Sequence, residues 1–260
     1  MSDLMQTFPI RKIVTHGPGV KSFYFDRMLD ADAGQFVNLW IPGVDEKPFS
    51  VSATGEDWIE ISVKAYGPFT HVLMEKKVGE FLGVRGPFGK GFTLRGNALL
   101  VGGGIGIAPL RLLAQQLAEK GLRFVSLLGA ATAHEIIFAE EFERLSACYF
   151  TTDDGSKGRR ALVTEHVAEI IEREKIEQVY AAGPEIMFVT LKKILDEVGV
   201  PYEFSMERYM KCGIGICGQC VLDDSGIRLC VEGPVVDQDD LKFVTELGLP
   251  HRDATGRRSG

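Results

Sequence analysis

The chain contains 260 residues, of which 45% are hydrophobic and 25% charged, and its formal net charge is −7. This composition excludes a disordered chain, and the acidic balance argues against a nucleic-acid-binding protein, which needs a basic face for phosphates. We find no signal peptide, and the longest apolar run, 98–110, is too short to span a membrane, so we expect a soluble cytoplasmic protein without a membrane segment.

The first 96 residues are rich in β-branched and aromatic residues between Gly and Pro. Short runs of this kind are typical of strands, and several at this spacing predict a small antiparallel β-barrel. The predicted strands are 11–14, 20–25, 36–40, 49–53 and 58–64, and a short helix is predicted at 70–75.

Two stretches of this segment have the composition of a flavin site. Residues 47–50 read KPFS and residues 64–70 read KAYGPFT. A cation suits a phosphate, a flat or apolar residue suits the flavin ring, and a hydroxyl suits a ring nitrogen. We expect Thr70 to cap the short helix, with its N–H groups directed at phosphate. A surface lysine with turn-forming Pro and Gly is the alternative explanation.

From residue 97 the pattern changes to apolar strands that alternate with amphipathic helices. This alternation predicts a parallel sheet with right-handed crossovers, in an α/β domain over 97–202. The predicted strands are 98–101, 124–128, 148–151 and 178–182, and the predicted helices are 108–120, 135–144, 162–174 and 185–198.

A glycine-rich turn follows the first of these strands. It contains Gly102, Gly103, Gly104 and Gly106, and it leads into a helix. Glycines allow a pyrophosphate to approach the backbone, and a helix N-terminus offers unpaired N–H groups. Because the spacing is not the strict G-x-G-x-x-G fingerprint, a tight turn that only packs the helix on the strand remains the alternative.

Polar or turn-forming residues follow two later strands of this domain. Asp153 and Asp154 follow the third strand, where carboxylates could hold ribose hydroxyls, and the alternative there is an Asp-Gly turn. Gly183 and Pro184 follow the fourth strand. Because the carboxyl ends of parallel strands share one edge, the three loops together predict a dinucleotide site. The two Asp residues would repel a 2′-phosphate, which favours NAD over NADP.

Four cysteines lie close together in the last segment, 203–260. Cys212, Cys217, Cys220 and Cys230 have the spacing C-x4-C-x2-C-x9-C, and its first part is the plant-type [2Fe–2S] run. Structural zinc or plain buried cysteines are the alternatives. We expect the fifth, Cys148, to be a buried strand residue, and the polar end 251–260 to be weakly ordered.

With these motifs in order, nearly all of residues 8–258 resemble the electron-transfer subunits of class 1B dihydroorotate dehydrogenase, which are ferredoxin reductase-like flavoproteins. The most specific stretches read GGGIGIAPL at 102–110, ERYMKCGIGICGQC at 207–220 and CVEGPVV at 230–236. The resemblance implies a mixed fold with an FAD-binding barrel at 1–96, an NAD-binding α/β domain at 97–202 and a small [2Fe–2S] lobe at 203–260.

The resemblance also implies roles for individual residues. The four clustered cysteines match the cluster ligands, and Lys47 stands where the family has an arginine. Phe69 stands where the family has a glycine in a phosphate contact that includes Thr70. The matched flavin contacts are Lys47, Pro48, Phe49, Ser50, Ser62, Val63, Lys64, Phe69 and Thr70.

The implied function is electron transfer in pyrimidine biosynthesis. An FMN-bearing catalytic subunit, in a heterotetramer with two copies of each chain, would oxidise dihydroorotate and pass electrons through [2Fe–2S] and FAD to NAD+. No residue of this chain then needs to act as an acid or base, because the cofactors carry the chemistry. The alternatives are a homologous subunit that serves a hydrogenase or a ferredoxin:NAD(P) oxidoreductase, and a zinc-stapled interaction module without enzymatic activity.

Overall fold

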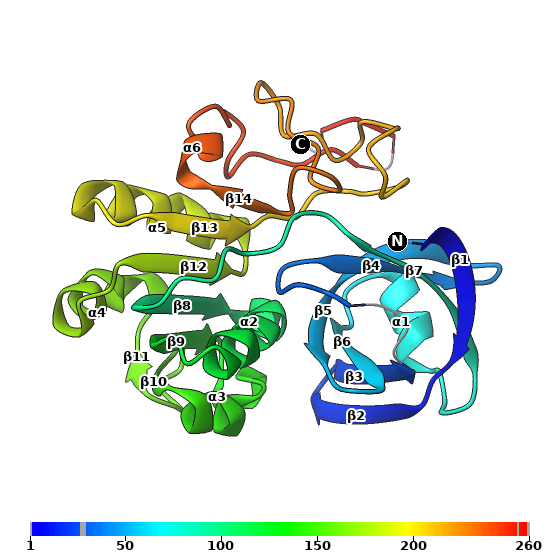
Figure 1. The fold of residues 1–260 in the computed structure, drawn as a ribbon, viewed down its shortest axis with the longest axis horizontal. Coiled ribbons are helices and arrows are strands. Elements are labelled where there is room, and N and C mark those ends of the chain that lie inside the picture. The colour runs from blue at the N-terminus through cyan, green and yellow to red at the C-terminus, as the bar shows by residue number, and fades with distance from the viewer. Residues whose placement is uncertain (1, 27–29, 254, 259–260) are drawn as a thin grey trace.

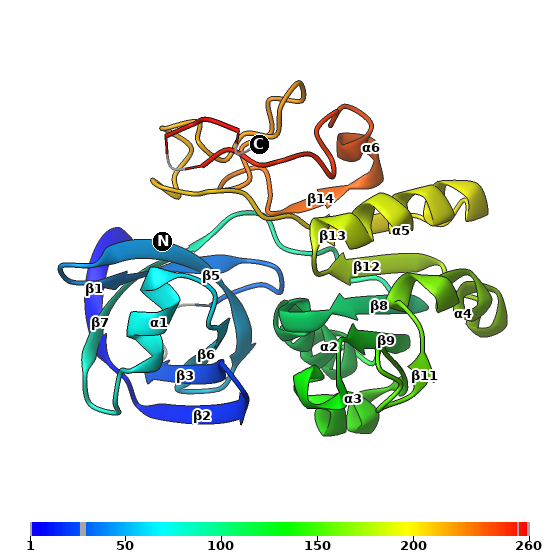
Figure 2. The same ribbon diagram turned by 180° about the vertical axis from the view of Figure 1, so that it is seen from behind.

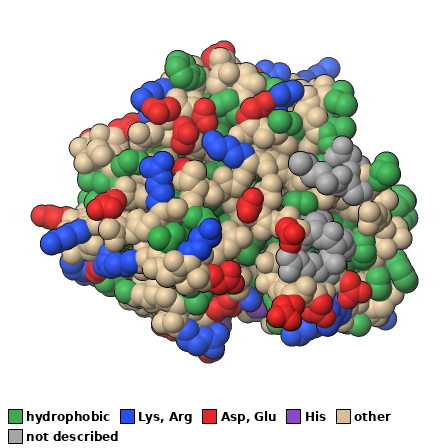
Figure 3. All heavy atoms as spheres, in the orientation of Figure 1, with side chains coloured by type: hydrophobic (Ala, Val, Ile, Leu, Met, Phe, Trp, Pro, Cys, Tyr) green, Lys and Arg blue, Asp and Glu red, His purple; other side chains and the backbone are tan. Residues whose placement is uncertain are grey.

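The computed structural model describes residues 2–26, 30–253 and 255–258. The chain forms two seven-stranded sheets, and a segment with little regular structure lies beside both (Figure 1). Acidic and basic side chains are interspersed over the face seen in Figure 3. Within the described ranges, no helix is long and apolar enough to cross a membrane.

The first sheet is antiparallel and curls into the predicted barrel, with the order β1-β7-β4-β5-β6-β3-β2. Its elements are β1 (Ser2–Pro9), β2 (Lys12–Gly17), β3 (Val20–Asp26), β4 (Phe36–Ile41), β5 (Asp45–Thr54), β6 (Trp58–Lys64), α1 (Pro68–Met74) and β7 (Phe81–Phe88). The five predicted strands are confirmed in place, whereas β1 and β7 were not predicted. Glycine and proline within β7 lower its strand propensity, and pairing with β1 and β4 overrides it.

Strand β6 shows how alternation orients the barrel toward the rest of the molecule. Ile59, Ile61 and Val63 are buried, at most 1% exposed, and belong to the core. Successive side chains of a strand point to opposite faces, so Glu60 and Lys64 lie on the outer face. Both make ion pairs with residues of the second domain, which shows that this outer face is the domain interface.

The second sheet has the order β11-β10-β9-β8-β12-β13-β14 and is parallel except for β14. This confirms the predicted parallel sheet. Strands β13 and β14 continue the sheet beyond residue 202, so the segment that follows the α/β domain is joined to it by hydrogen bonds. The strands are β8 (Ala98–Gly103), β9 (Phe124–Ala130), β10 (Ala147–Thr152), β11 (Arg159–Arg160), β12 (Gln178–Ala182), β13 (Tyr202–Ser205) and β14 (Val235–Asp237).

Helices cover both faces of this sheet (Figures 1 and 2). Helices α2 and α3 pack together on the barrel side, and α4 and α5 pack together on the other side. Two predicted helices, 135–144 and 162–174, begin later than expected because a 3₁₀ turn precedes each. The helices are η1 (Gly104–Gly106), α2 (Ile107–Glu119), η2 (Ala133–Glu135), α3 (Ala139–Leu145), η3 (Val163–His166), α4 (Val167–Glu174), α5 (Glu185–Val198) and α6 (Gln238–Leu241).

The sheet separates two hydrophobic cores. Leu128 belongs to a core that joins the barrel to α2 and α3, whereas its neighbour Leu127 belongs to a core on the opposite face. The second core includes Phe188 of α5 and Leu229 of the segment after β13. The α/β domain therefore shares one core with the barrel and another with the cysteine-containing segment.

Candidate functional site

The glycine-rich turn lies where the strand order of the second sheet reverses. From β8 the chain moves outward to β9 and β10, and then returns to place β12 on the other side of β8. Ligands of such sheets bind in the crevice outside the carboxyl ends of the two strands at this point. Gly103 ends β8, and Gly183 and Pro184 directly follow β12. The structure therefore brings the two predicted loops to one crevice.

The glycines of this turn have different roles. A Cβ atom added to Gly106 would lie 2.3 Å from the carbonyl oxygen of Ala182, so only glycine allows η1 to pack against the end of β12. A Cβ added to Gly102 would lie 3.0 Å from Cγ1 of Ile107, which makes Gly102 a packing position. Gly104 has a φ of +54°, and a Cβ there would meet no atom within 4 Å. Its backbone is thus open to a ligand.

The two predicted carboxylates lie on the same edge of the sheet, after β10. Both are exposed. The Asp154 carboxylate accepts hydrogen bonds from the Ser156 hydroxyl at 2.6 Å and the Ser156 N–H at 2.9 Å, and these bonds lower the pKa of Asp154. The side chain is therefore ionised at neutral pH, and it also stabilises the turn that the alternative explanation describes.

The flavin-motif residues occupy β5, β6 and α1. The rings of Phe49 and Phe69 stack with their centres 5.8 Å apart, so the two predicted stretches meet. The Val63 side chain points into the barrel and can offer only its backbone. Helix α1 begins at Pro68, which makes Thr70 its third residue rather than its cap. The Thr70 hydroxyl oxygen accepts hydrogen bonds from the N–H groups of Tyr66 and Gly67, at 2.8 and 2.9 Å.

Lys47 contacts the cysteine-containing segment directly. Its ammonium group lies 2.5 Å from the Asp45 carboxylate and donates to the Tyr209 hydroxyl at 2.9 Å. Partial burial opposes its charge, but these two partners raise the pKa of Lys47. Tyr209 precedes the first cluster cysteine by three residues, and sequence reasoning did not select it.

A polar group on the outer face of β4, β5 and β7 makes a second connection to that segment. The Glu46 carboxylate accepts hydrogen bonds from Asn38 Nδ2 and Arg85 Nε, both at 2.6 Å. Arg85 also donates to the carbonyl oxygen of Lys211 at 3.5 Å. Asn38 is 1% exposed, and its Oδ1 atom has no hydrogen-bond partner. Sequence reasoning missed these residues because nothing in the local pattern links them to position 211.

The four clustered cysteines lie in a stretch, 206–234, that contains no helix or strand. Their thiols influence one another in two pairs, Cys212 with Cys217 and Cys220 with Cys230. Among the described side chains, no three His, Cys, Asp or Glu converge closely enough to hold a single ion as they stand. Two pairs nevertheless suit a [2Fe–2S] centre, in which four thiolates bind two irons.

The backbone of this stretch stabilises thiolate. The N–H of Gly215 donates to Cys230 Sγ at 3.2 Å, and the N–H of Cys217 donates to Cys212 Sγ at 3.5 Å. Burial opposes ionisation of Cys212, but the N–H groups of Cys217 and Ile214 lower the pKa of Cys212 to about 7. The interaction between the two thiols lowers the pKa of Cys220 and raises that of Cys230. Thiolate is the form that binds iron.

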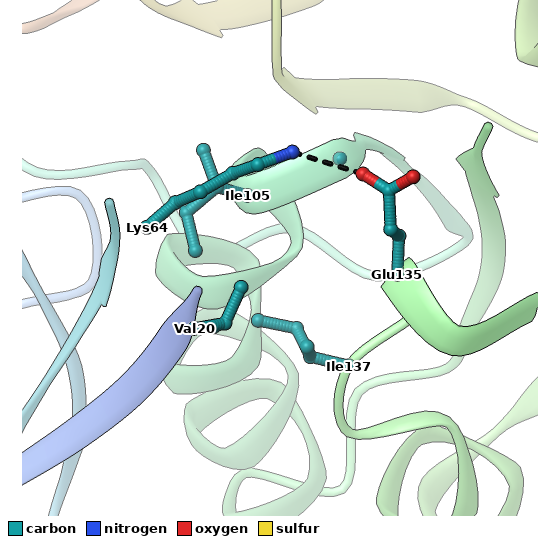
Figure 4. A pocket seen from close by; sticks show the side chains of 6 residues that line it. Val20, Lys64, Ile105, Glu135 and Ile137 are labelled. Atoms are coloured by element: carbon teal, nitrogen blue, oxygen red, sulfur yellow. Dashed lines mark hydrogen bonds and ion pairs between the residues drawn. The ribbon is translucent and has the colours of Figure 1, made fainter. Parts of the chain in front are cut away.

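The flavin-motif strand and the glycine-rich turn meet at a small pocket (Figure 4). Lys64 of the motif pairs with Glu135 of η2 at 2.9 Å across this pocket. The pocket is lined by Val20, Lys64, Gly104, Ile105, Glu135 and Ile137. The predicted flavin residues and the predicted dinucleotide residues are therefore neighbours.

Two family models match the chain. Residues 207–242 match the iron–sulfur cluster binding domain of dihydroorotate dehydrogenase B, and residues 100–193 match the oxidoreductase NAD-binding domain. The first match contains all four clustered cysteines, and the second contains the glycine-rich turn and the loops after β10 and β12.

Curated relatives match almost the whole chain. A probable dihydroorotate dehydrogenase B (NAD(+)), electron transfer subunit, from Methanocaldococcus jannaschii is 43% identical over 250 residues, 96% of either chain. Its namesake from Methanothermobacter thermautotrophicus is 43% identical over 262 residues, 97% of this chain and 96% of the relative.

Solved structures share the fold. One is the structure of an NADH-dependent reduced ferredoxin-NADP oxidoreductase, described for flavin-based electron bifurcation. It has a TM-score of 0.82 at 32% identity, and the match covers 91% of this chain and 92% of the other chain. A ferredoxin NADP+ reductase from Neisseria gonorrhoeae has a TM-score of 0.66 at 18% identity, over 75% of this chain and 92% of its own. The predicted mixed fold is thereby confirmed.

Proposed function

The chain belongs to the family of dihydroorotate dehydrogenase B electron transfer subunits, and we propose that it passes electrons from a partner that oxidises dihydroorotate, through [2Fe–2S] and FAD, to NAD+. The observation that carries this proposal is the meeting of three sites. Lys64 of β6 borders the glycine-rich turn at one pocket, and Lys47 of the other flavin stretch, on β5, contacts Tyr209 beside the cysteines. One chain thus offers neighbouring sites for a hydride carrier, a flavin and a one-electron centre.

Each group has its own set of residues. Gly104 presents open backbone to the pyrophosphate of NAD, and Asp153 and Asp154 are available to ribose hydroxyls. Lys47 and the α1 region would hold FAD, and the two thiolate pairs would hold the cluster. When bound, FAD exchanges hydride with NAD and single electrons with the cluster. The chain's own residues bind, orient and exclude water, and none has to act as an acid or base.

We assign three functional parts, an FAD-binding barrel at 1–96, an NAD-binding domain at 97–202 and a cluster lobe at 203–260. The lobe is tied to the neighbouring sheet through β13 and β14. The two carboxylates after β10 favour NAD, because a 2′-phosphate beside them would be repelled. We also propose the cytoplasm as the location, since a cluster of free cysteines suits a reducing compartment.

The surface beside the cluster cysteines suits a partner subunit. Cys217 is exposed, and Ile216 nearby is 79% exposed. Ile214 and Val231 add further exposed apolar area on the same loops. Exposed apolar groups around a redox centre are expected where another protein covers them. We propose that the FMN-bearing catalytic subunit docks here, in an assembly of two copies of each chain.

A second candidate is a subunit of a ferredoxin:NAD(P) oxidoreductase or a hydrogenase. The ferredoxin-NADP oxidoreductase structure, 32% identical over 91% of this chain, favours it, but the dihydroorotate dehydrogenase B relatives are more similar, at 43%. The zinc-stapled module has no such support, because the matched model for the four cysteines is an iron–sulfur domain.

The proposal is tested by reconstitution. The isolated chain is expected to pass electrons from NADH to a dye and to leave dihydroorotate unchanged. After co-expression with the FMN-bearing subunit, dihydroorotate should support NAD+ reduction. Dihydroorotate oxidation by the isolated chain would contradict this division of labour. Tight binding to a hydrogenase subunit, with none to the FMN-bearing subunit, would establish the second candidate instead.

A further inference from the structure

A buried ion pair joins the barrel to the NAD-binding domain. Glu60 of β6 is fully buried, and Arg111 of α2 is 9% exposed. The Arg111 guanidinium lies 2.5 Å from Glu60 Oε2 and, through Nε, 2.7 Å from Glu141 Oε2 on α3. Its face also lies 4.3 Å from the centre of the Phe138 ring. One side chain of α2 thus contacts β6 of the barrel, α3 and the residue before α3.

The two ends of this ion pair stand next to the two predicted binding motifs. Glu60 precedes Ser62 and Lys64 of the flavin motif on the same strand. Arg111 lies one helical turn after Ile107, where α2 begins directly behind Gly104 and Gly106. The ion pair therefore connects the strand that carries the flavin motif to the helix that carries the dinucleotide turn.

The other end of α2 has a separate attachment to the barrel. The Gln116 side chain accepts a hydrogen bond from the N–H of Ala33 at 3.1 Å and donates one to the carbonyl oxygen of Ala31 at 3.3 Å. Apolar contacts within the shared core also hold the helix. Loss of Arg111 would consequently leave α2 docked and would remove the polar attachment only at the end that carries the turn.

We propose that Arg111 is a positioning residue, which fixes the dinucleotide turn against the flavin-motif strand and so sets the distance over which hydride is transferred. This inference rests on the proposed function. A buried ion pair is a weak source of stability, because the loss of hydration offsets the attraction between its charges. A guanidinium held by two carboxylates is, however, fixed in direction. Hydride transfer requires such precision, since a displacement of ~1 Å can lower a rate by ~10²-fold.

The test replaces the ion pair by apolar side chains of similar length, in the variant Glu60→Met/Arg111→Met. We expect unchanged thermal stability, FAD content and iron content, and an unchanged Kd for NADH. The rate of flavin reduction by NADH in a single turnover should fall at least ~10-fold. Amide hydrogen exchange should become faster over residues 104–111, which reports position without reference to activity. Arg123→Met is the matched control, because Arg123 pairs with Glu174 within one domain and should change neither quantity.

A double variant with the wild-type rate and wild-type exchange would overturn the proposal and leave Arg111 with a structural role. If the double variant does not fold, Arg111→Lys decides. A lysine keeps the charge but cannot reach both carboxylates as a fork, so an intermediate rate with unchanged NADH affinity is expected, and an unchanged rate would overturn the proposal. If NADH fails to reduce the flavin even in the wild type, the proposed function fails, whereas the exchange measurement still judges Arg111 alone.

Discussion

The interface between the barrel and α2 differs in construction from the cysteine lobe. The interface is made of regular strands and helices, with a continuous apolar core around one buried ion pair. The lobe contains a 29-residue stretch, 206–234, without a helix or strand, in which glycines of positive φ bring backbone N–H groups to sulfur. The first region is held by side chains of the protein itself, whereas the second carries the four cysteines that would bind the cluster.

This difference has a consequence for stability. Burial and hydrogen bonds hold the interface, so we expect its geometry to persist when NAD or FAD is removed. The lobe contributes Leu222 and Leu229 to a core that it shares with the α/β domain, and metal binding there supplies part of the folding free energy. Substitutions should therefore act locally and specifically in the first region and should affect folding in the second.

The largest effect is expected for Cys217→Ser. The wild type should contain about two iron and two acid-labile sulfide per chain, and this variant should lose both together with the visible absorption of the cluster. Proteolysis should then cut within 206–234 while the barrel and the NAD-binding domain persist. Cys148→Ser, on β10, is the control and should keep its iron. Stoichiometric zinc without labile sulfide in the wild type would refute the assignment.

Gly104→Val tests the glycine-rich turn at the start of α2. The new side chain would occupy the open backbone of the turn, so we expect the Kd for NADH to rise at least ~10-fold, or about 1.4 kcal/mol, with FAD still bound. The measurement is flavin bleaching by NADH in stopped flow. Gly121→Val is a matched control. Gly121 also has a positive φ and open surroundings, but it follows the C-terminal end of α2, at the opposite end of the helix from the turn. If both substitutions raise the Kd for NADH equally, backbone strain explains the result and the assignment of the turn fails.

Ile216→Asp tests whether the lobe surface is an interface. Burial of an isoleucine is worth about 1.5–3 kcal/mol, so the affinity for the FMN-bearing subunit should fall roughly 10- to 100-fold. Isothermal titration calorimetry with the isolated chain gives this value, and iron content should not change. Val78→Asp, at an exposed apolar residue of the barrel, serves as the control. If the Ile216 variant binds the FMN-bearing subunit with unchanged affinity, the proposed docking surface is wrong.

The smallest effect concerns the C-terminal end. Arg252 and Arg258 pair with Asp223, and these bonds lower the pKa of Asp223 to about 2. Because this pKa is lower when folded, its stabilisation is present at neutral pH and disappears as the pH falls from about 4 to 2. Asp223→Asn should cost no more than about 1 kcal/mol at pH 7, since the arginines are partly exposed, and should flatten the acid-unfolding curve. An unaltered curve would show that the pairs contribute nothing.

These ion pairs belong to the polar end, 251–260, for which weak order remains a prediction and of which residues 254, 259 and 260 lie outside the described residues. In the described part, Arg252 and Arg258 pair with Asp223, and Gln219 donates to the carbonyl oxygen of Asp253. Sequence patterns cannot show such contacts, because positions 223 and 252 are far apart in the chain. The same reason explains why Tyr209, Asn38 and the Glu60–Arg111 pair were missed.

What the sequence did predict depends on local regularity. The alternation in β6 and the apolar runs of β8 and β12 placed these strands within a few residues, because a period of two or an unbroken apolar run is visible without partners. The cysteine spacing likewise predicted a cluster segment that the family match confirms. The roles of the individual flavin, dinucleotide and cysteine residues remain predictions, since they depend on groups that bind between elements.

The shared core between barrel and α2 affects how this chain can be divided. Ile107 and Leu110 of α2 belong to the same continuous core as Ile61 and Leu73 of the barrel. A fragment that ends at residue 96 would leave this apolar face uncovered, and such surfaces promote aggregation. We therefore expect the barrel and the α/β domain to fold as one cooperative unit. The change of pattern at residue 97 is then not a boundary of folding.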